Sequence, residues 1–152
     1  MRKIQRETVV AVPVGQVWEF IADMNNWAHD LPGYCSHETK SDRESIWTLK
    51  GDIGILSREI DVRVVITEWV EQNRVRFTVE GVYDPVKGGG QVGIAADGPT
   101  QTKLIIDGEL EAGGLMAPVI NTLLGKMLPG MCDKFVASLC ADLAKCKKEG
   151  PK

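Results

Sequence analysis

The chain has 152 residues, 43% of them hydrophobic and 26% charged, which is enough apolar material for one domain with a real core. Its 18 basic and 21 acidic residues are well mixed and leave a net charge of −3, which argues against the clustered basic face of a nucleic-acid-binding protein. The N-terminus lacks an apolar signal core and no run of 18 uncharged apolar residues occurs, so we expect a cytoplasmic protein without a membrane-spanning segment.

The first 31 residues predict one strand and two short helices. Apolar and polar residues alternate over Lys3–Ala11, which indicates a strand. Apolar residues at helical spacing then predict a short helix over Val14–Asp23. We expect Asn25-Asn26 to end this helix before a second helical turn over Trp27–Leu31.

The middle of the chain predicts a run of antiparallel strands. The clearest alternation places Val62, Val64 and Ile66 on one face of a single strand. The connections between successive strands are short, which favours a meander, and one apolar face per strand indicates that only one side is covered. The predicted strands are Tyr34–Lys40, Glu44–Gly51, Ile55–Val70, Arg74–Gly81, Gln91–Ala96 and Thr102–Ala112.

A glycine-rich segment interrupts this run. Gly88-Gly89-Gly90 lacks the Lys-Ser/Thr of a phosphate loop and the following helix of a dinucleotide site. We therefore predict a flexible connection over Asp84–Gly90, with a flap over a ligand portal as the alternative.

The C-terminal stretch Leu115–Lys147 predicts one long, mostly apolar helix, roughly 50 Å long at about 1.5 Å per residue. Pro129 lies inside it, removes one backbone donor and crowds the preceding turn, so we expect a kink or a break there. The apolar residues at helical spacing are Ile120, Leu123, Leu124, Met127, Leu128, Met131, Phe135, Leu139 and Leu143.

This helix is the only large cover that the predicted sheet can use. We therefore predict an α+β fold in a single domain, residues 1–152: a curved antiparallel sheet wrapped around a long C-terminal helix, with two short helices after the first strand. The residues Lys147–Lys152 are expected to form a solvated tail. The gap between helix and sheet is the expected place of function.

Four segments and the order of the elements resemble the helix-grip, or START-like, superfamily (SRPBCC) of hydrophobic-ligand binders and polyketide cyclases. Within it, the chain looks most like the CoxG-like family, which is named for its association with carbon monoxide dehydrogenase. The segment Val12–Asp23 fits the opening pattern apolar-Pro-x-x-x-Val-Trp-x-x-apolar-x-Asp. The other matching segments are Leu31-Pro32-Gly33, Ile66-Thr67-Glu68-Trp69 and Gly113-Gly114-Leu115 before the long helix. The resemblance covers about residues 4 to 147.

The resemblance implies a cavity that binds or carries a small hydrophobic molecule, such as a lipid, a quinone or a polyketide-like compound. Two alternatives stay open. The chain could be a cyclase- or hydratase-type enzyme of the same fold, or an accessory protein of a membrane-associated redox dehydrogenase complex. The identity of the ligand, the partner protein and the oligomeric state are left open by the sequence.

The predicted ligand site combines apolar residues of the sheet and the helix with a few side chains that carry a polar group. We expect the first half of the helix, Leu115–Leu128, to face the ligand, and the second half, from Met131, to pack on the sheet. A solid core without a cavity is the alternative. The predicted ligand-binding residues are Trp27, His37, Trp47, Val64, Phe77, Val79, Tyr83, Ile120, Leu123, Leu124 and Met127.

Catalytic and metal-binding patterns are sparse in the sequence. His37 is a weak candidate for a general base, whereas His29 and Asp30 are predicted to lie at the surface. The two histidines lack metal-ligand spacing on a helix, and the four cysteines form no Cys-x-x-Cys pair, so no metal site and no cofactor are predicted. The cysteines are interpreted as structural thiols.

Overall fold

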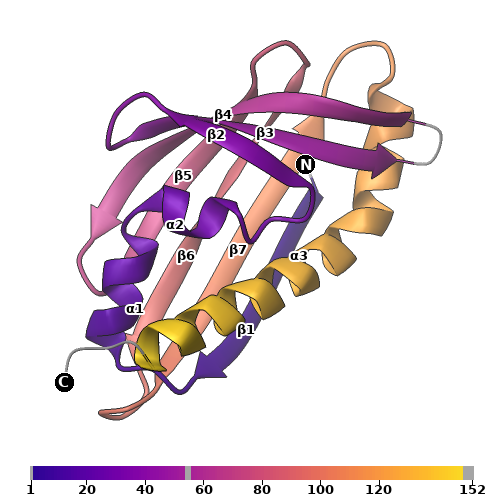
Figure 1. Ribbon diagram of the computed structural model, residues 1–152. Helices are drawn as coiled ribbons and strands as arrows, with labels where there is room; N and C mark the ends of the chain where they lie inside the picture. The colour runs from indigo at the N-terminus through magenta and orange to yellow at the C-terminus, as the bar shows by residue number, and fades with distance from the viewer. Residues whose placement is uncertain (1, 54–55, 149–152) are drawn as a thin grey trace.

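The computed structural model describes residues 2–53 and 56–148, with side chains for residues 3–50 and 59–145. The strands are β1 (Arg2–Val10), β2 (Tyr34–Thr39), β3 (Glu44–Ile53), β4 (Leu56–Val70), β5 (Arg74–Gly81), β6 (Val86–Ala96) and β7 (Thr102–Ala112). The helices are α1 (Val14–Ile21), α2 (Met24–Ala28) and α3 (Ala117–Lys148). Figure 1 shows one curved sheet with α3 lying along its concave side.

The seven strands form a single antiparallel sheet in the order β1-β7-β6-β5-β4-β3-β2. Successive strands are neighbours from β2 to β7, and β1 adds to the far edge beside β7. The predicted meander and the predicted α+β, helix-grip fold are therefore confirmed.

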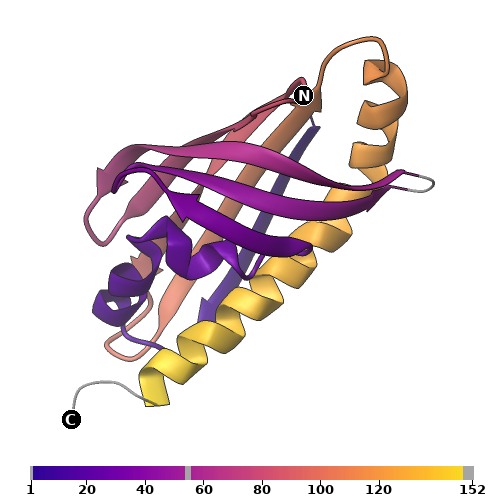
Figure 2. The ribbon, with the colours of Figure 1, turned by 45° about the horizontal axis from the view of Figure 1, so that its top comes forward.

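The concave face of the sheet is apolar because the strands alternate. Val62, Val64 and Ile66 of β4 are all buried, as their spacing predicted. In the next strand, Val79 is the partner of Val64 and Phe77 is the partner of Ile66. The register therefore aligns the apolar residues of neighbouring strands on the face that the helices cover (Figure 2).

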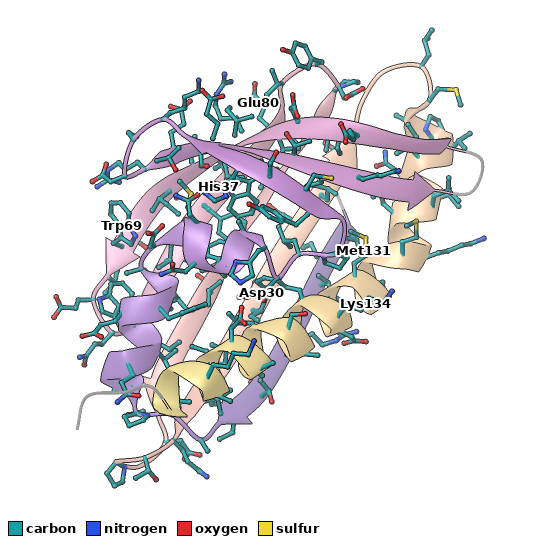
Figure 3. The ribbon with its side chains drawn as sticks, in the orientation of Figure 1. Asp30, His37, Trp69, Glu80, Met131 and Lys134 are labelled. Atoms are coloured by element: carbon teal, nitrogen blue, oxygen red, sulfur yellow. The ribbon has the colours of Figure 1, made fainter. Side chains whose placement is uncertain are left out.

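The long helix α3 is continuous through Pro129. Figures 1 and 2 both show a bend between its orange N-terminal part and its yellow C-terminal part, and Figure 3 places Met131 close to this bend. The predicted kink is thus present, whereas the alternative of a break is wrong. Beyond the bend, the predicted stripe is buried in the core at Phe135, Leu139 and Leu143.

The part of α3 before Pro129 covers little of the sheet. Between residues 117 and 128, only Leu124 is buried. This part is attached to the end of β7 by Asn121, whose carboxamide accepts a hydrogen bond from the Ala112 N–H (2.8 Å) and donates one to the Ala112 carbonyl (3.0 Å). These two hydrogen bonds fix where the helix starts, and the bend then turns it across the sheet.

Asn25-Asn26 does not interrupt the helical region as predicted. Both residues lie inside α2, because Asp23 caps that helix and its carboxylate accepts a hydrogen bond from the Asn25 N–H at 2.9 Å. The break between the two short helices comes one turn earlier than the sequence suggested.

The predicted flexible connection over Asp84–Gly90 is wrong from Val86 onward, and so is the portal flap. β6 already begins at Val86, and Gly88, Gly89 and Gly90 pair on both sides with β5 and β7. A Cβ at Gly88 would collide with the carbonyl oxygen of Glu109 in β7. These glycines therefore serve close approach of neighbouring backbones rather than flexibility.

Two expectations concern residues that are not described. The predicted start of a strand at Ile55 and most of the predicted tail, Lys147–Lys152, lie outside the described residues. Among the helices that are described, none is long and apolar enough to cross a bilayer.

Candidate functional site

An apolar cavity of about 200 Å³ lies between the concave face of the sheet and the helices α2 and α3. It is smaller than the roughly 300–1,000 Å³ of typical ligand pockets, yet larger than an engineered apolar cavity of about 150 Å³ that binds benzene. Its lining consists of Ile4, Trp27, Leu31, Pro32, Trp47, Leu49, Val62, Val64, Phe77, Val79, Gly89, Val92, Ile106, residues 107–110, Leu128, Met131, Cys132 and Phe135.

The space exists partly because one row of inward positions carries two glycines. Across four strands, Ile4, Gly108, Gly90 and Phe77 are successive partners. The two central positions bear no side chain, so the sheet between Ile4 and Phe77 stays bare. A Cβ at Gly108 would meet Ile4 Cγ2 at 3.8 Å, which is ordinary contact, whereas a Cβ at Gly90 would collide with the carbonyl oxygen of Asp107.

Aromatic rings from four elements form one wall of the cavity. The ring of Trp27 on α2 lies 5.5 Å from that of Trp47, edge to face, 5.4 Å from Phe77 and 6.1 Å from Phe135. The Trp27 indole N–H donates to the Ile21 carbonyl at 3.0 Å, which fixes the orientation of the ring. Rings packed in this way present rigid faces and edges to a flat ligand.

Trp47 carries the one polar group of this wall that lacks a partner among the described residues. Its side chain is 2% exposed, and its indole Nε1–H finds no acceptor. Leaving a buried donor unpaired costs about 1–3 kcal/mol. By contrast, the indole N–H groups of Trp27 and Trp69 both donate to backbone carbonyls. Trp47 is therefore the tryptophan of the lining whose donor is left without a partner in the described part of the chain.

The cavity approaches the surface between α3 and the loop after α2. Pro32, Leu128 and Met131 are half-buried, whereas Trp47 and Val64 on the opposite side are buried. The more exposed residues therefore mark the rim, and the aromatic wall lies at the deep end.

The structure brings only some of the sequence-predicted residues to the cavity. Those that line it are Trp27, Trp47, Val64, Phe77 and Val79. Those that do not line it are His37, Tyr83, Ile120, Leu123, Leu124 and Met127.

His37 and Tyr83 are both at the surface. His37 is exposed on the edge strand β2, with its Nδ1 atom 2.6 Å from the Tyr34 hydroxyl. Tyr83 is 82% exposed in the connection between β5 and β6. Strand alternation alone could not show that β2 forms an edge of the sheet.

The predicted division of the helix holds only in part: the half beyond Met131 packs on the core as expected, but it also supplies most of the helical lining of the cavity, whereas the first half contributes Leu128. The part of α3 that lines the cavity begins at Leu128 and continues with Met131, Cys132 and Phe135. These residues lie at and beyond the bend, where α3 crosses the concave face. Phe135 therefore packs on the core and faces the cavity at once.

Sequence reasoning also missed Ile4 and Gly108. The first strand was not expected to reach the cavity, because its place beside β7 depends on pairing across the whole chain. A single glycine inside an alternating strand is a recognised signal for close approach or a missing side chain. Gly108 carries that signal and could have been found.

The titratable groups along the lining are few in the described part of the chain. Burial raises the pKa of the Cys132 thiol, while the charge of Arg6 lowers it by a smaller amount and that of Asp133 raises it. The thiol therefore stays protonated at neutral pH. Asp107 accepts a hydrogen bond from the Gln91 amide at 2.8 Å, and alternation places both residues on the convex side. Glu109 follows two positions later on the same side and pairs with Lys3 at 3.9 Å. The described lining thus consists mainly of apolar surface.

Comparisons with known proteins agree with this fold. The sequence profile of a family described as polyketide cyclase / dehydrase and lipid transport matches residues 1–144. A search among curated proteins found no match.

Several solved structures are similar over nearly the whole chain. A conserved protein from Geobacillus kaustophilus is 18% identical, with a TM-score of 0.80 over 95% of this chain and 96% of that chain. A START superfamily protein from Mycobacterium smegmatis is 14% identical, with a TM-score of 0.71 and coverage of 95% and 99%. The Zhui aromatase/cyclase from Streptomyces sp. R1128 is 14% identical, with a TM-score of 0.72 and coverage of 95% and 94%. At these identities the likeness establishes the fold.

Proposed function

The chain belongs to the polyketide cyclase / dehydrase and lipid transport family, and from that premise we propose that it binds one small, flat, apolar molecule bearing an acceptor oxygen. The observation that carries this proposal is that Trp47, one of the residues lining an otherwise apolar cavity, has a buried indole N–H without an acceptor among the described residues. An apolar pocket with a single oriented donor selects a molecule that has one polar end.

The volume of the cavity limits the size of this molecule. A space of about 200 Å³ holds one or two aromatic rings on the scale of the benzene-binding cavity of about 150 Å³. A whole phospholipid or a four-ring polyketide would need the rim at Leu128 and Met131 to open. Among the three ligand classes that the sequence suggested, a small quinone fits best, and an aromatic ketone shares its flat shape and its carbonyl oxygen.

The chemistry of the wall supports the same class of ligand. Trp27, Phe77 and Phe135 offer ring faces and edges to a planar molecule. A carbonyl oxygen that reaches Trp47 would pair its N–H and remove the cost of an orphaned donor.

Binding is favoured here over catalysis. The one sequence candidate for a general base, His37, lies outside the cavity, and the Cys132 thiol is held in its unreactive form. The cyclase- or hydratase-type activity has no specific observation in its favour. The finer likeness to the CoxG-like family, with a redox-enzyme partner, stays a prediction from the sequence.

Two probes of matched shape test the proposal. 2-Acetylnaphthalene and 2-ethylnaphthalene differ essentially in one carbonyl oxygen, and calorimetric titration measures the affinity of each. We expect the wild type to bind both and Trp47→Phe to lower the affinity for the ketone about 3- to 10-fold, since one hydrogen bond contributes about 0.5–1.5 kcal/mol. The affinity for the hydrocarbon should hardly change.

Trp69→Phe is the matched control. Its indole N–H donates to the Ala22 carbonyl at 3.0 Å and Trp69 does not line the cavity, so both affinities should stay as in the wild type. No binding of either probe at millimolar concentration would overturn the binding proposal. Equal losses for both probes in Trp47→Phe would instead refute the role of the N–H.

A further inference from the structure

We propose that His29, Asp30 and Asp142 form a binding site for one divalent transition-metal ion of the zinc type, separate from the cavity. The three residues come from the end of α2 and from α3, and they offer one imidazole nitrogen and two carboxylates. Their donor atoms all lie within 4.8 Å of one another. No metal-ligand spacing is visible in the sequence here, because His29 and Asp142 lie 113 residues apart.

The distances match what a bound ion needs. His29 Nε2 lies 2.8 Å from Asp142 Oδ2 and 3.8 Å from Asp30 Oδ1. Ligands about 2.0–2.2 Å from a zinc ion are separated from one another by distances of this order. Only small side-chain shifts would therefore place all three donors around one ion.

The burial of Asp30 is the observation that sets this cluster apart from ordinary surface charges. The Asp30 side chain is only 4% exposed, although the sequence placed it at the surface. Its Oδ2 atom is buried and has no hydrogen-bond donor among the described residues. A buried carboxylate oxygen without a donor is expensive unless a proton or a cation satisfies it.

A proton is the competing occupant. Burial, followed by the hydrogen bond and the charge of Asp142, raises the pKa of Asp30 to about 7. Burial acts to raise the pKa of Asp142 as well, but the hydrogen bonds of Asp30 and His29 outweigh it, and the pKa of Asp142 is lowered.

The surrounding charges leave room for an added cation. Lys145 Nζ lies 4.0 Å from Asp142 Oδ1 and is the nearest positive group at the cluster besides His29, among the described side chains. The Lys145 side chain is 73% exposed, so it can swing into solvent when an ion binds. Figure 3 shows Asp30 between α2 and α3. The His29 side chain is 50% exposed, so an ion could reach the cluster from solvent.

The donor set favours zinc-like ions over Mg²⁺ or Ca²⁺. Imidazole suits zinc and its neighbours in the transition series, whereas Mg²⁺ and Ca²⁺ prefer oxygen ligands alone. Three protein ligands leave one tetrahedral position for water. An ion here would join the end of α2 to α3, which the Trp27–Phe135 contact also connects, so it would strengthen the attachment of these two helices.

Calorimetric titration of the full chain with ZnCl₂ near neutral pH tests the proposal, and the visible absorption of added Co²⁺ reports the coordination geometry. We expect one equivalent to bind, and a Tm increase of about 5–10 °C at a hundredfold excess of zinc over the Kd. His29→Ala and Asp142→Asn should each weaken binding at least tenfold. His29 is half exposed, so His29→Ala keeps the fold, which circular dichroism verifies.

The double variant Cys35→Ser/His37→Ala is the control, because it removes an exposed thiol and the other histidine without touching the cluster. It should bind zinc as the wild type does. Absence of binding up to millimolar ZnCl₂ would overturn the proposal and leave a shared proton as the occupant. Binding that is lost in this control but kept in His29→Ala would overturn it too.

Discussion

Gly108→Val should weaken ligand binding at least tenfold while it stabilises the fold. Gly108 lies in the interior of β7 and lines the cavity, where a Cβ has Ile4 Cγ2 as its neighbour at 3.8 Å. Ile4 itself packs against the core, so the new side chain points to the concave side. A β-branched residue suits a strand, and its three carbons would occupy the bare sheet beside Phe77.

The magnitude follows from the burial of these three carbons. At about 0.8 kcal/mol for each buried methylene equivalent, the added side chain contributes up to about 2.4 kcal/mol. Replacing a strand glycine adds about 0.5–1 kcal/mol through the lower entropy of the unfolded chain, and ordering the valine offsets part of the gain. We expect a net increase of about 1–3 kcal/mol in the free energy of unfolding.

The assay measures stability and binding on the same protein. Urea denaturation gives the free energy of unfolding, and titration with 2-acetylnaphthalene gives the affinity, which should fall at least tenfold. Gly130→Ala is the matched control, because a Cβ at this exposed helical position meets nothing within 4 Å. It should gain up to about 1 kcal/mol from helix propensity and bind the probe as the wild type does.

Two results would refute this reasoning. If Gly108→Val bound the probe normally, the ligand would not occupy the space above Gly108. If the variant lost more than about 1 kcal/mol of stability, the valine would be colliding with its surroundings, and the position would not face an open cavity.

Two further predictions concern the core and the acidic pair. Phe135→Ala should cost about 3–5 kcal/mol in urea denaturation, because Phe135 is 6% exposed and supports Trp27; a loss below about 1 kcal/mol would contradict this packing. Asp30→Asn should gain stability relative to the wild type as the pH rises from about 4 to about 7. The reason is that the pKa of Asp30 is raised to about 7 in the folded protein, whereas the unfolded chain releases this proton near pH 3.8, so the wild type loses stability over this range. If the free energies of unfolding of the two proteins differed by the same amount at pH 4 and pH 8, this prediction would be contradicted.

Local patterns determined the elements of this fold and their buried faces. Alternation at Val62, Val64 and Ile66, and helical spacing at Leu139 and Leu143, each predicted burial that the structure has. These patterns work because a strand repeats every two residues and a helix every 3.6, so the apolar face follows from the order of neighbours in the chain. Because the sequence predicts one large helix, that helix was the expected cover of the apolar face of the sheet.

The same local reasoning failed where the surroundings of a residue come from distant parts of the chain. Gly88-Gly89-Gly90 has the composition of a loop, yet it lies in β6. Glycine is needed there because the backbones of β5 and β7 approach too closely for side chains. Pro129 correctly predicted a kink, but only the tertiary structure decided which side of the kink lines the cavity.

The position of the candidate sites was likewise decided by the tertiary structure. The cavity depends on the register that sets Gly108 between Ile4 and Gly90, and on the bend that brings Phe135 over this row. Buried polar groups such as the Trp47 N–H are invisible in the sequence, because whether a donor finds an acceptor depends on packing. The sequence determined which faces are apolar, and the three-dimensional arrangement decided where those faces leave space.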